Sequence, residues 1–159
     1  MSSAKPIKYL RTFNKEYDDF LITSINDEVA TDRYYWAIWL NFKPLTVGGC
    51  QQKVKKDDDV LFAYTIVTTP GVTTHFMKLS GPDHGIINRP VVLKVTDGLT
   101  GAPIQNAFLD DVHKTDAQGQ VSIAFSRVGT HIVKAEKGPE PRNTFVRSNQ
   151  LFINVIVGP

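Results

Sequence analysis

The chain of 159 residues contains a single cysteine, Cys50, so no disulfide can form within it. It has no apolar run near the roughly 20 residues that cross a bilayer as a helix. Its first ten residues, MSSAKPIKYL, also lack the hydrophobic stretch of a signal peptide. We therefore expect a protein without a membrane span. A lone cysteine fits a reducing compartment or a partner cysteine elsewhere, so the compartment stays open.

The chain also has little net charge. It carries 18 Lys and Arg against 16 Asp and Glu, for a formal charge of +2, and the basic residues are dispersed. A surface that neutralises phosphates needs clustered Lys and Arg, so nucleic acid is not an expected partner. The 42% hydrophobic content is ordinary for a globular chain that buries a core.

Recognisable catalytic and metal-binding motifs are missing as well. The sequence has no Gly-x-Ser-x-Gly, no Gly-rich phosphate loop and no His-Glu-x-x-His. The histidines are not spaced as metal ligands; they are His75, His84, His113 and His131. We therefore predict no catalytic residue, no metal site and no cofactor. An enzyme remains possible only through a composite site at a domain junction, around His75, Asp83 and His84.

Three aspartates flank a predicted turn and invite comparison with a calcium loop. Asp110, Asp111 and Asp116 lack the Asp-x-Asp-x-Asp-Gly rhythm and the distal glutamate of a dedicated Ca²⁺ loop. The pattern favours a solvated turn.

The second half of the chain alternates short apolar runs with Gly- or Asp-bearing turns, as an all-β sandwich does. In residues 91–96 and 121–125 every second side chain is apolar, so one face of each strand packs and the other is wet. The segment TDAQG at 115–119 predicts a tight turn closed by a left-handed Gly119. Further strands are expected at 107–109, 130–136 and 151–157.

The first half holds segments rich in aromatic and β-branched residues, which favour strands. Strands are predicted at 20–25, 34–42 and 60–67, with a short one at 51–54 after a loop in which Gly48 and Gly49 permit positive φ. Prolines and glycines at 80–90 interrupt the pattern and predict a linker. We therefore expect a first domain at 1–79 and a second at 91–159.

The first half also resembles a known domain. The residues concerned are YYWAIWLNFKPLTVGGCQQKVKKDDDVLFAY at 34–64 and HFMKLSGP at 75–82. They are similar to a domain of unknown function in secreted or surface proteins of filamentous fungi and actinomycetes, related to the β-grasp C-terminal domain of transcobalamin. The part from 91 to 157 resembles the immunoglobulin-like domain that follows it, including Arg147-Ser148-Asn149. The resemblance implies a mainly β chain, with a β-grasp-like domain before an immunoglobulin-like antiparallel β-sandwich, in a secreted or cell-surface protein.

The resemblance also implies that the β-grasp-like domain is partial. Members of that family begin with a further strand pair, a helix and a cysteine-bearing loop before the segment corresponding to Phe13 onward. If Cys50 corresponds to the family cysteine that pairs with this loop, it is a free thiol here. A missing helix would expose an apolar sheet face or an unpaired edge, which favours a homo-oligomer or strand completion by another chain.

A covalent cross-link is a further possibility. The phrase LKVTDGLTGAPIQNA at 93–107 is similar to bacterial Cna B-type domains, in which a lysine and an asparagine form an isopeptide bond. The candidates would be Lys94 and Asn154, with Glu136 as the assisting carboxylate. Alternation between inward Leu93 and Val95 instead predicts that the Lys94 side chain points to solvent.

The strand predicted at 34–42 suggests a binding surface. Its even positions form a wholly apolar face, and its odd positions form a mixed face that includes Tyr35 and Trp39. A partly exposed Tyr35 and Trp39 would stack on a sugar or dock a protein; alternatively both line the core. We expect a non-enzymatic surface or secreted module that binds carbohydrate or protein through its first domain, with the sandwich as a spacer.

Overall fold

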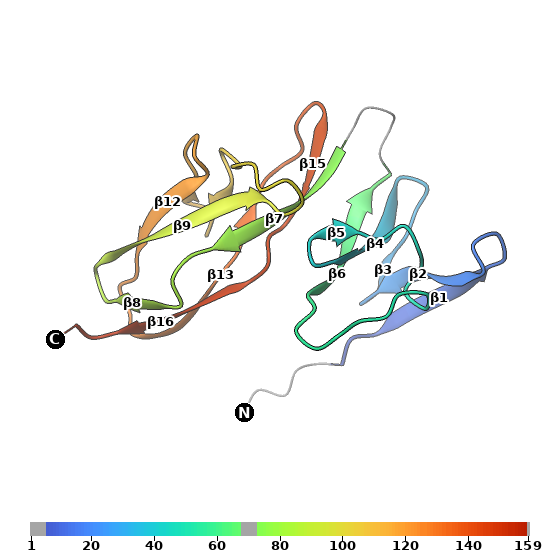
Figure 1. The fold of residues 1–159 in the computed structure, drawn as a ribbon, viewed down its shortest axis with the longest axis horizontal. Coiled ribbons are helices and arrows are strands. Elements are labelled where there is room, and N and C mark those ends of the chain that lie inside the picture. Colours follow the sequence, from blue (N-terminus) through green and yellow to red (C-terminus); the bar gives the residue numbers. More distant parts are fainter. Residues whose placement is uncertain (1–5, 68–72, 159) are drawn as a thin grey trace. The chain divides into compact units, whose positions relative to one another are not determined.

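The computed structural model describes residues 6–67 and 73–158, and within them the chain is entirely β (Figure 1). These residues contain no helix, and so no helix with the length and hydropathy to cross a membrane. The chain divides into two compact units, Met1–Thr69 (unit 1) and Pro70–Pro159 (unit 2). The prediction of a mainly β chain is confirmed.

Unit 1 consists of two three-stranded antiparallel sheets. The first has the order β1-β2-β3, and the second has the order β5-β4-β6. Their strands are β1 (Tyr9–Asn14), β2 (Asp19–Ile25), β3 (Glu28–Val29), β4 (Tyr34–Leu40), β5 (Lys43–Pro44) and β6 (Val60–Ile66). The β-grasp assignment of this unit stays a prediction.

Unit 1 differs from the sequence-based expectation in two places. Strand β1 was not expected, because its side chains alternate weakly and nearly all are exposed. The short strand predicted at 51–54 is absent, and this segment is a turn followed by coil. The reason lies in its hydrogen bonds: the Gln51 N–H donates to the Gly48 carbonyl at 3.1 Å, and the Gln51 side chain donates to the Tyr17 carbonyl at 2.9 Å.

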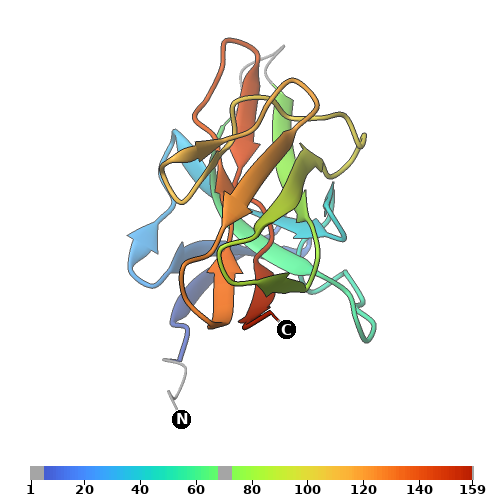
Figure 2. The same ribbon diagram turned by 90° about the vertical axis from the view of Figure 1, so that its left-hand side faces the viewer.

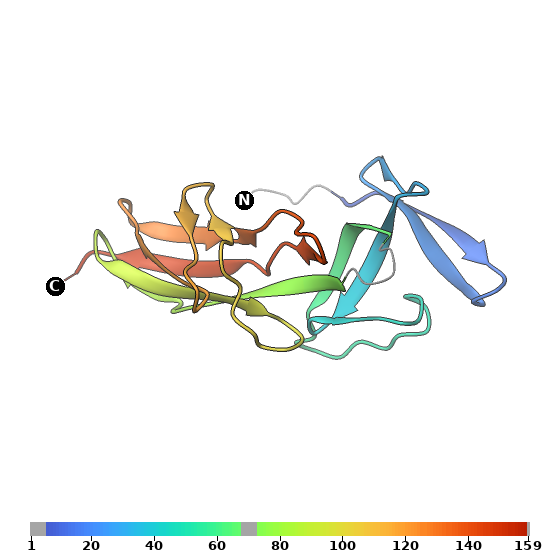
Figure 3. The ribbon, with the colours of Figure 1, turned by 90° about the horizontal axis from the view of Figure 1, so that it is seen from above.

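Unit 2 is a sandwich of two main sheets, seen as separate layers in Figure 3. A four-stranded sheet has the order β12-β9-β7-β15 and a three-stranded sheet has the order β13-β16-β8, with a small third sheet ordered β11-β10-β14. The strands are β7 (Thr73–Ser80), β8 (His84–Ile86), β9 (Pro90–Asp97), β10 (Phe108–Leu109), β11 (His113–Lys114), β12 (Gln120–Ala124), β13 (Gly129–Val133), β14 (Ala135–Glu136), β15 (Asn143–Val146) and β16 (Leu151–Ile156).

The core of unit 2 lies between its sheets and follows the predicted alternation. Leu93, Val95 and Ile123 are buried, whereas the intervening Lys94 and Ser122 are exposed. The same cluster draws buried residues from β7, β10, β13, β14 and β16. The sandwich was predicted to be antiparallel, but two of its strand pairs are parallel: β15 with β7, and β16 with β8.

The predicted boundary between the domains is also corrected. Strand β7 was assigned to the first domain, but it pairs with β9 from Met77↔Asp97 to Ser80↔Lys94, and Met77 and Leu79 belong to the sandwich core. The segment expected to be a linker at 80–90 contains β8, which pairs with β16 at the end of unit 2 where the C-terminus lies (Figures 1 and 2). The prolines and glycines there interrupt strands within one unit and do not separate two.

Glycine has two different roles in these units. Gly119 closes the predicted turn with φ of 72°, and a β-carbon there would collide with the Val95 carbonyl. Gly48 does not adopt the positive φ that the sequence suggested. It is required instead by close approach, because a β-carbon at this position would overlap the carboxylate of Asp19, which is buried at the start of β2.

A substitution at Gly48 tests this close contact. We expect Gly48→Ala to lower the free energy of unfolding by about 1–3 kcal/mol, since the new methyl group must displace the buried Asp19. Gly49→Ala is the matched control, because its β-carbon would meet only Ile38 Cδ1, at 3.4 Å. Urea unfolding measures both variants, and equal destabilisation by the two would contradict this role for Gly48.

Candidate binding surface

One face of the second sheet of unit 1 carries most of its aromatic side chains. The pairing of β4 with β6, from Tyr34↔Ile66 to Leu40↔Val60, places the even-numbered residues of both strands on the same side. We call this side the aromatic face. It consists of Tyr34, Trp36, Ile38, Leu40, Val60, Phe62, Tyr64 and Ile66.

The rings on the aromatic face contact one another. Tyr34 stacks on Tyr64 with centroids 5.4 Å apart and an interplanar angle of 20°, and Trp36 lies 5.2 Å from the same ring at 43°. Such aromatic pairs contribute about 0.5–1.5 kcal/mol beyond area burial, so each ring restrains its neighbours. Tyr34 and Phe62 still expose 37% and 40% of their surfaces.

The polar atoms of two rings hold strand β3. Trp36 Nε1 donates to the Glu28 carbonyl at 3.0 Å, and the Tyr64 hydroxyl donates to the Val29 carbonyl at 2.8 Å. These bonds fix the ring orientations and tie the two sheets of unit 1 together. They also leave fewer polar groups on the aromatic face for a ligand.

The opposite side of the same sheet is the buried one, which corrects the predicted binding face. Trp39 is only 3% exposed, and Ala63 and Thr65 on the same side are buried, whereas Tyr35 is 42% exposed. The structure therefore does not present Tyr35 and Trp39 together as a ligand surface. The signal that sequence reasoning missed is in β6, where small Ala63 and Thr65 alternate with bulky Phe62 and Tyr64, so that the rings of β6 lie on the side opposite to Trp39.

In unit 2, His75 belongs to a cluster that joins three strands. Its Nδ1 pairs with Asp97 Oδ2 on β9, and its Nε2 lies 3.1 Å from Asn143 Oδ1 on β15. Its ring also stacks on Phe145, with centroids 5.6 Å apart. Both ring nitrogens are engaged, so this histidine serves as an internal brace between β7 and its two neighbours.

The Asp97 carboxylate is held in its ionised form. Burial raises its pKa, but hydrogen bonds from the Thr100 N–H at 2.9 Å, from His75 and from the Leu99 N–H at 2.8 Å outweigh that effect and lower the pKa overall. The same bonds shape the turn that follows β9.

The composite site suggested around His75, Asp83 and His84 is not assembled. His84 Nδ1 lies 2.8 Å from Asp83 Oδ1, and both side chains are exposed. His84 is paired with Asn154, and His75 with Phe145, at opposite ends of unit 2 (Figure 1). The two histidines therefore cannot act on one substrate within this unit.

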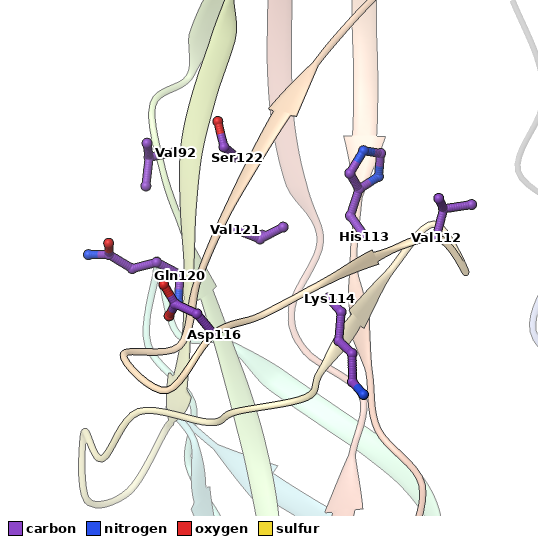
Figure 4. Close-up of a pocket in the computed structure, with 8 residues that line it drawn as sticks. All are labelled: Val92, Val112, His113, Lys114, Asp116, Gln120, Val121 and Ser122. Carbon is purple, nitrogen blue, oxygen red and sulfur yellow. The ribbon is translucent and has the colours of Figure 1, made fainter.

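An open cavity of about 500 Å³ lies between β11 and β12. It is lined by Val92, Val112, His113, Lys114, Asp116, Gln120, Val121 and Ser122 (Figure 4). The Asp116 carboxylate accepts hydrogen bonds from the N–H groups of Gln118 and Gln120, and Lys114 lies over the Phe108 ring. His113 and Lys114 point in different directions in Figure 4, so the polar groups do not converge on a ligand.

Residues 6–67 and 73–158 contain no group of three or more His, Cys, Asp or Glu side chains placed to hold a metal ion. Cys50 is an exposed free thiol. Lys94 and Asn154, the isopeptide candidates, are both exposed on strands of different sheets, so the prediction that Lys94 points to solvent is confirmed. The buried Leu93 and Ile153 beside them lie in the core between those sheets.

The His75–Asp97 brace predicts a pH-dependent stability. Because the folded-state pKa of Asp97 lies below its unfolded value of about 4, its contribution is present above about pH 4 and is lost as pH falls through the folded-state pKa. We expect Asp97→Asn to lower the free energy of unfolding by about 2 kcal/mol at pH 7, and by less at lower pH. Urea unfolding from pH 7 to pH 2 measures the difference.

The matched control for this experiment is Asp83→Asn. Asp83 also accepts a bond from a histidine, but both members of this pair are exposed, so the unfolding midpoint should stay the same. If Asp97→Asn lowered the free energy of unfolding by the same amount at every pH, the stabilising role of the ionised Asp97 carboxylate would be contradicted.

Comparisons of the chain with protein-family models, with curated proteins and with solved structures find no match. The resemblance to the fungal and actinomycete domain therefore stays a prediction, and function must be inferred from this chain's own surfaces.

Proposed function

We propose that this chain is a non-enzymatic binding module that takes a protein ligand on the aromatic face of unit 1. The observation that carries the proposal is a set of mutually packed rings, Tyr34, Trp36 and Tyr64, which are partly exposed on one side of a sheet. Aromatic side chains are enriched in protein interfaces, where they supply large contact area.

The composition and rigidity of this face support the proposal. None of its residues is charged, and charged residues are depleted at the centres of protein interfaces. Hydrogen bonds from Trp36 and Tyr64 to β3 restrain the rings before any ligand arrives. Such preorganisation reduces the entropy lost on binding.

The polar groups favour a protein over a carbohydrate. A sugar presents many hydroxyl groups, which need hydrogen-bond partners once they leave water. On the aromatic face, Trp36 Nε1 and the Tyr64 hydroxyl already donate to Glu28 and Val29. Apolar Val60 and Phe62 extend the exposed area beside the rings and fit an apolar protein surface.

In this proposal unit 2 is a spacer. Its core is continuous and its only histidine–carboxylate pair with a buried carboxylate serves as a brace among the described residues. The resemblance of the sequence supports a secreted or cell-surface location for such a module.

The proposal predicts that binding depends on Tyr34. The labelled full chain is panned against a phage-displayed random peptide library and, separately, applied to a glycan array. Selected peptides should bind Tyr34→Ser at least tenfold more weakly than the original chain, because an exposed ring of the aromatic face that stacks on Tyr64 is lost. Tyr9→Ser is the matched control, since Tyr9 is 57% exposed but lies on β1 of the other sheet.

The other outcomes are decisive as well. Glycans that bind in a Tyr34-dependent way, without peptides that do so, would replace the protein ligand by a carbohydrate. Ligands that bind both variants equally, or a failure to select any ligand in either format, would contradict the aromatic face as the binding surface.

A further inference from the structure

Strand β6 is an unpaired sheet edge without the usual protection. It is the last strand in the order β5-β4-β6, and its seven residues, VLFAYTI, include no charge and no proline. Exposed edges of this kind readily pair with another strand, and proteins normally block them with charges, prolines, bulges or short length.

The other edges of unit 1 carry such devices. Strand β1 contains Arg11 and an irregularity between Leu10 and Arg11. Strands β3 and β5 have only two residues each, Glu28–Val29 and Lys43–Pro44. In unit 2, β12 has five residues and faces β11 across the cavity of Figure 4. Among the strands that the structure describes, β6 is the longest at a sheet edge.

The backbone pattern shows which groups of β6 point outward. The Asn41 N–H donates to the Asp59 carbonyl at 2.9 Å, and the Val67 N–H donates to the Arg33 carbonyl at 2.8 Å. Bonding alternates along an antiparallel pair, so the odd-numbered residues of this segment bond to β4. The N–H and C=O groups of the even-numbered residues therefore point to the free edge; these residues are Val60, Phe62, Tyr64 and Ile66.

We propose that two copies of this chain associate by pairing their β6 strands antiparallel, centred on Ala63. In this register the outward-bonding residues of one copy meet those of the other: Phe62 lies opposite Tyr64 of the second copy, and Val60 lies opposite Ile66. The strand is thus complementary to itself, with aromatic opposite aromatic and β-branched opposite β-branched side chains. Such cross-strand pairs each contribute about 0.2–1 kcal/mol.

Charge selects the antiparallel direction. The acidic run Asp57-Asp58-Asp59 immediately precedes β6. A parallel pair of β6 strands would place the two acidic runs side by side, where like charges repel. In the antiparallel pair Asp59 lies opposite Val67 of the second copy, so the runs sit at opposite ends.

This inference goes beyond the proposed function and has a consequence for it. Residues opposite each other in an antiparallel pair project from the same side of the sheet. Phe62 and Tyr64 of one copy would therefore adjoin Tyr64 and Phe62 of the other. The two three-stranded sheets become one, and the aromatic faces of both copies form a continuous surface.

Charges introduced at Val60 and Ile66 test the proposed β6–β6 register in the full chain. Sedimentation velocity over a concentration series should show a species of about twice the 17.7 kDa of one chain. In Val60→Lys/Ile66→Lys, lysine faces lysine at both ends of the pair, and dimerisation should weaken at least tenfold. In Val60→Glu/Ile66→Lys, glutamate faces lysine at both ends, and the dimer should return at low salt.

A cross-link gives a second measurement that does not depend on charged variants folding. In a Cys50→Ser background, Ala63→Cys places the new thiols opposite each other in a non-hydrogen-bonded pair, where the Cα atoms are about 4.5 Å apart. Mild oxidation should give a disulfide-linked dimer. Leu61→Cys in the same background is the control, since residue 61 lies opposite Thr65 of the second copy and should cross-link much more slowly.

Three results would overturn the proposal. They are a monomeric original chain at every concentration, a dimer unaffected by the two-lysine variant, and equal cross-linking of the residue-61 and residue-63 variants. Loss of peptide binding in Tyr34→Ser with an intact dimer separates the proposed function from this inference.

Discussion

The pairing of β4 with β6 determines the arrangement of unit 1, because each side chain of the two strands is committed to one face or the other. On one side lie Trp39, Ala63 and Thr65, all of which are buried. On the other side the bulkier rings gather, and only part of their surface is covered. The aromatic face and the attachment of β3 through Trp36 and Tyr64 follow from this register, which also sets the backbone groups that β6 presents at its open edge.

Unit 2 differs from unit 1 in having a core enclosed between two sheets. Its core closes on both sides between two main sheets, and the His75–Asp97 pair and Asn143 join neighbouring strands from within. Its cavity is open, and of the polar residues that line it Asp116 holds a turn and Lys114 contacts a ring. Unit 2 also exposes apolar side chains such as Val112 and Phe152. What distinguishes unit 1 is a group of mutually packed, partly exposed rings on one face of a sheet, and we propose recognition there.

Much of unit 2 follows from the sequence, because period-two alternation in strands such as Val91–Thr96 and a turn such as TDAQG depend on local residues alone. The domain boundary does not, since Met77 and Leu79 read as one more apolar alternation until their pairing with β9 is known. The buried face of β4 was mispredicted for a similar reason. Trp36 and Trp39 are both large and apolar, and which of them is covered depends on the packing of the folded unit and not on the residues of β4 alone.

The claim that the aromatic face is the exposed side of the β4–β6 sheet can be tested directly by hydroxyl-radical footprinting of the full chain, read by mass spectrometry. The structure predicts rapid oxidation at Tyr34, which is 37% exposed, and protection of Trp39, which is 3% exposed although tryptophan is intrinsically the more reactive side chain. Oxidation of Trp39 at least as fast as that of Tyr34 would contradict the register on which the binding surface and the β6 edge both depend.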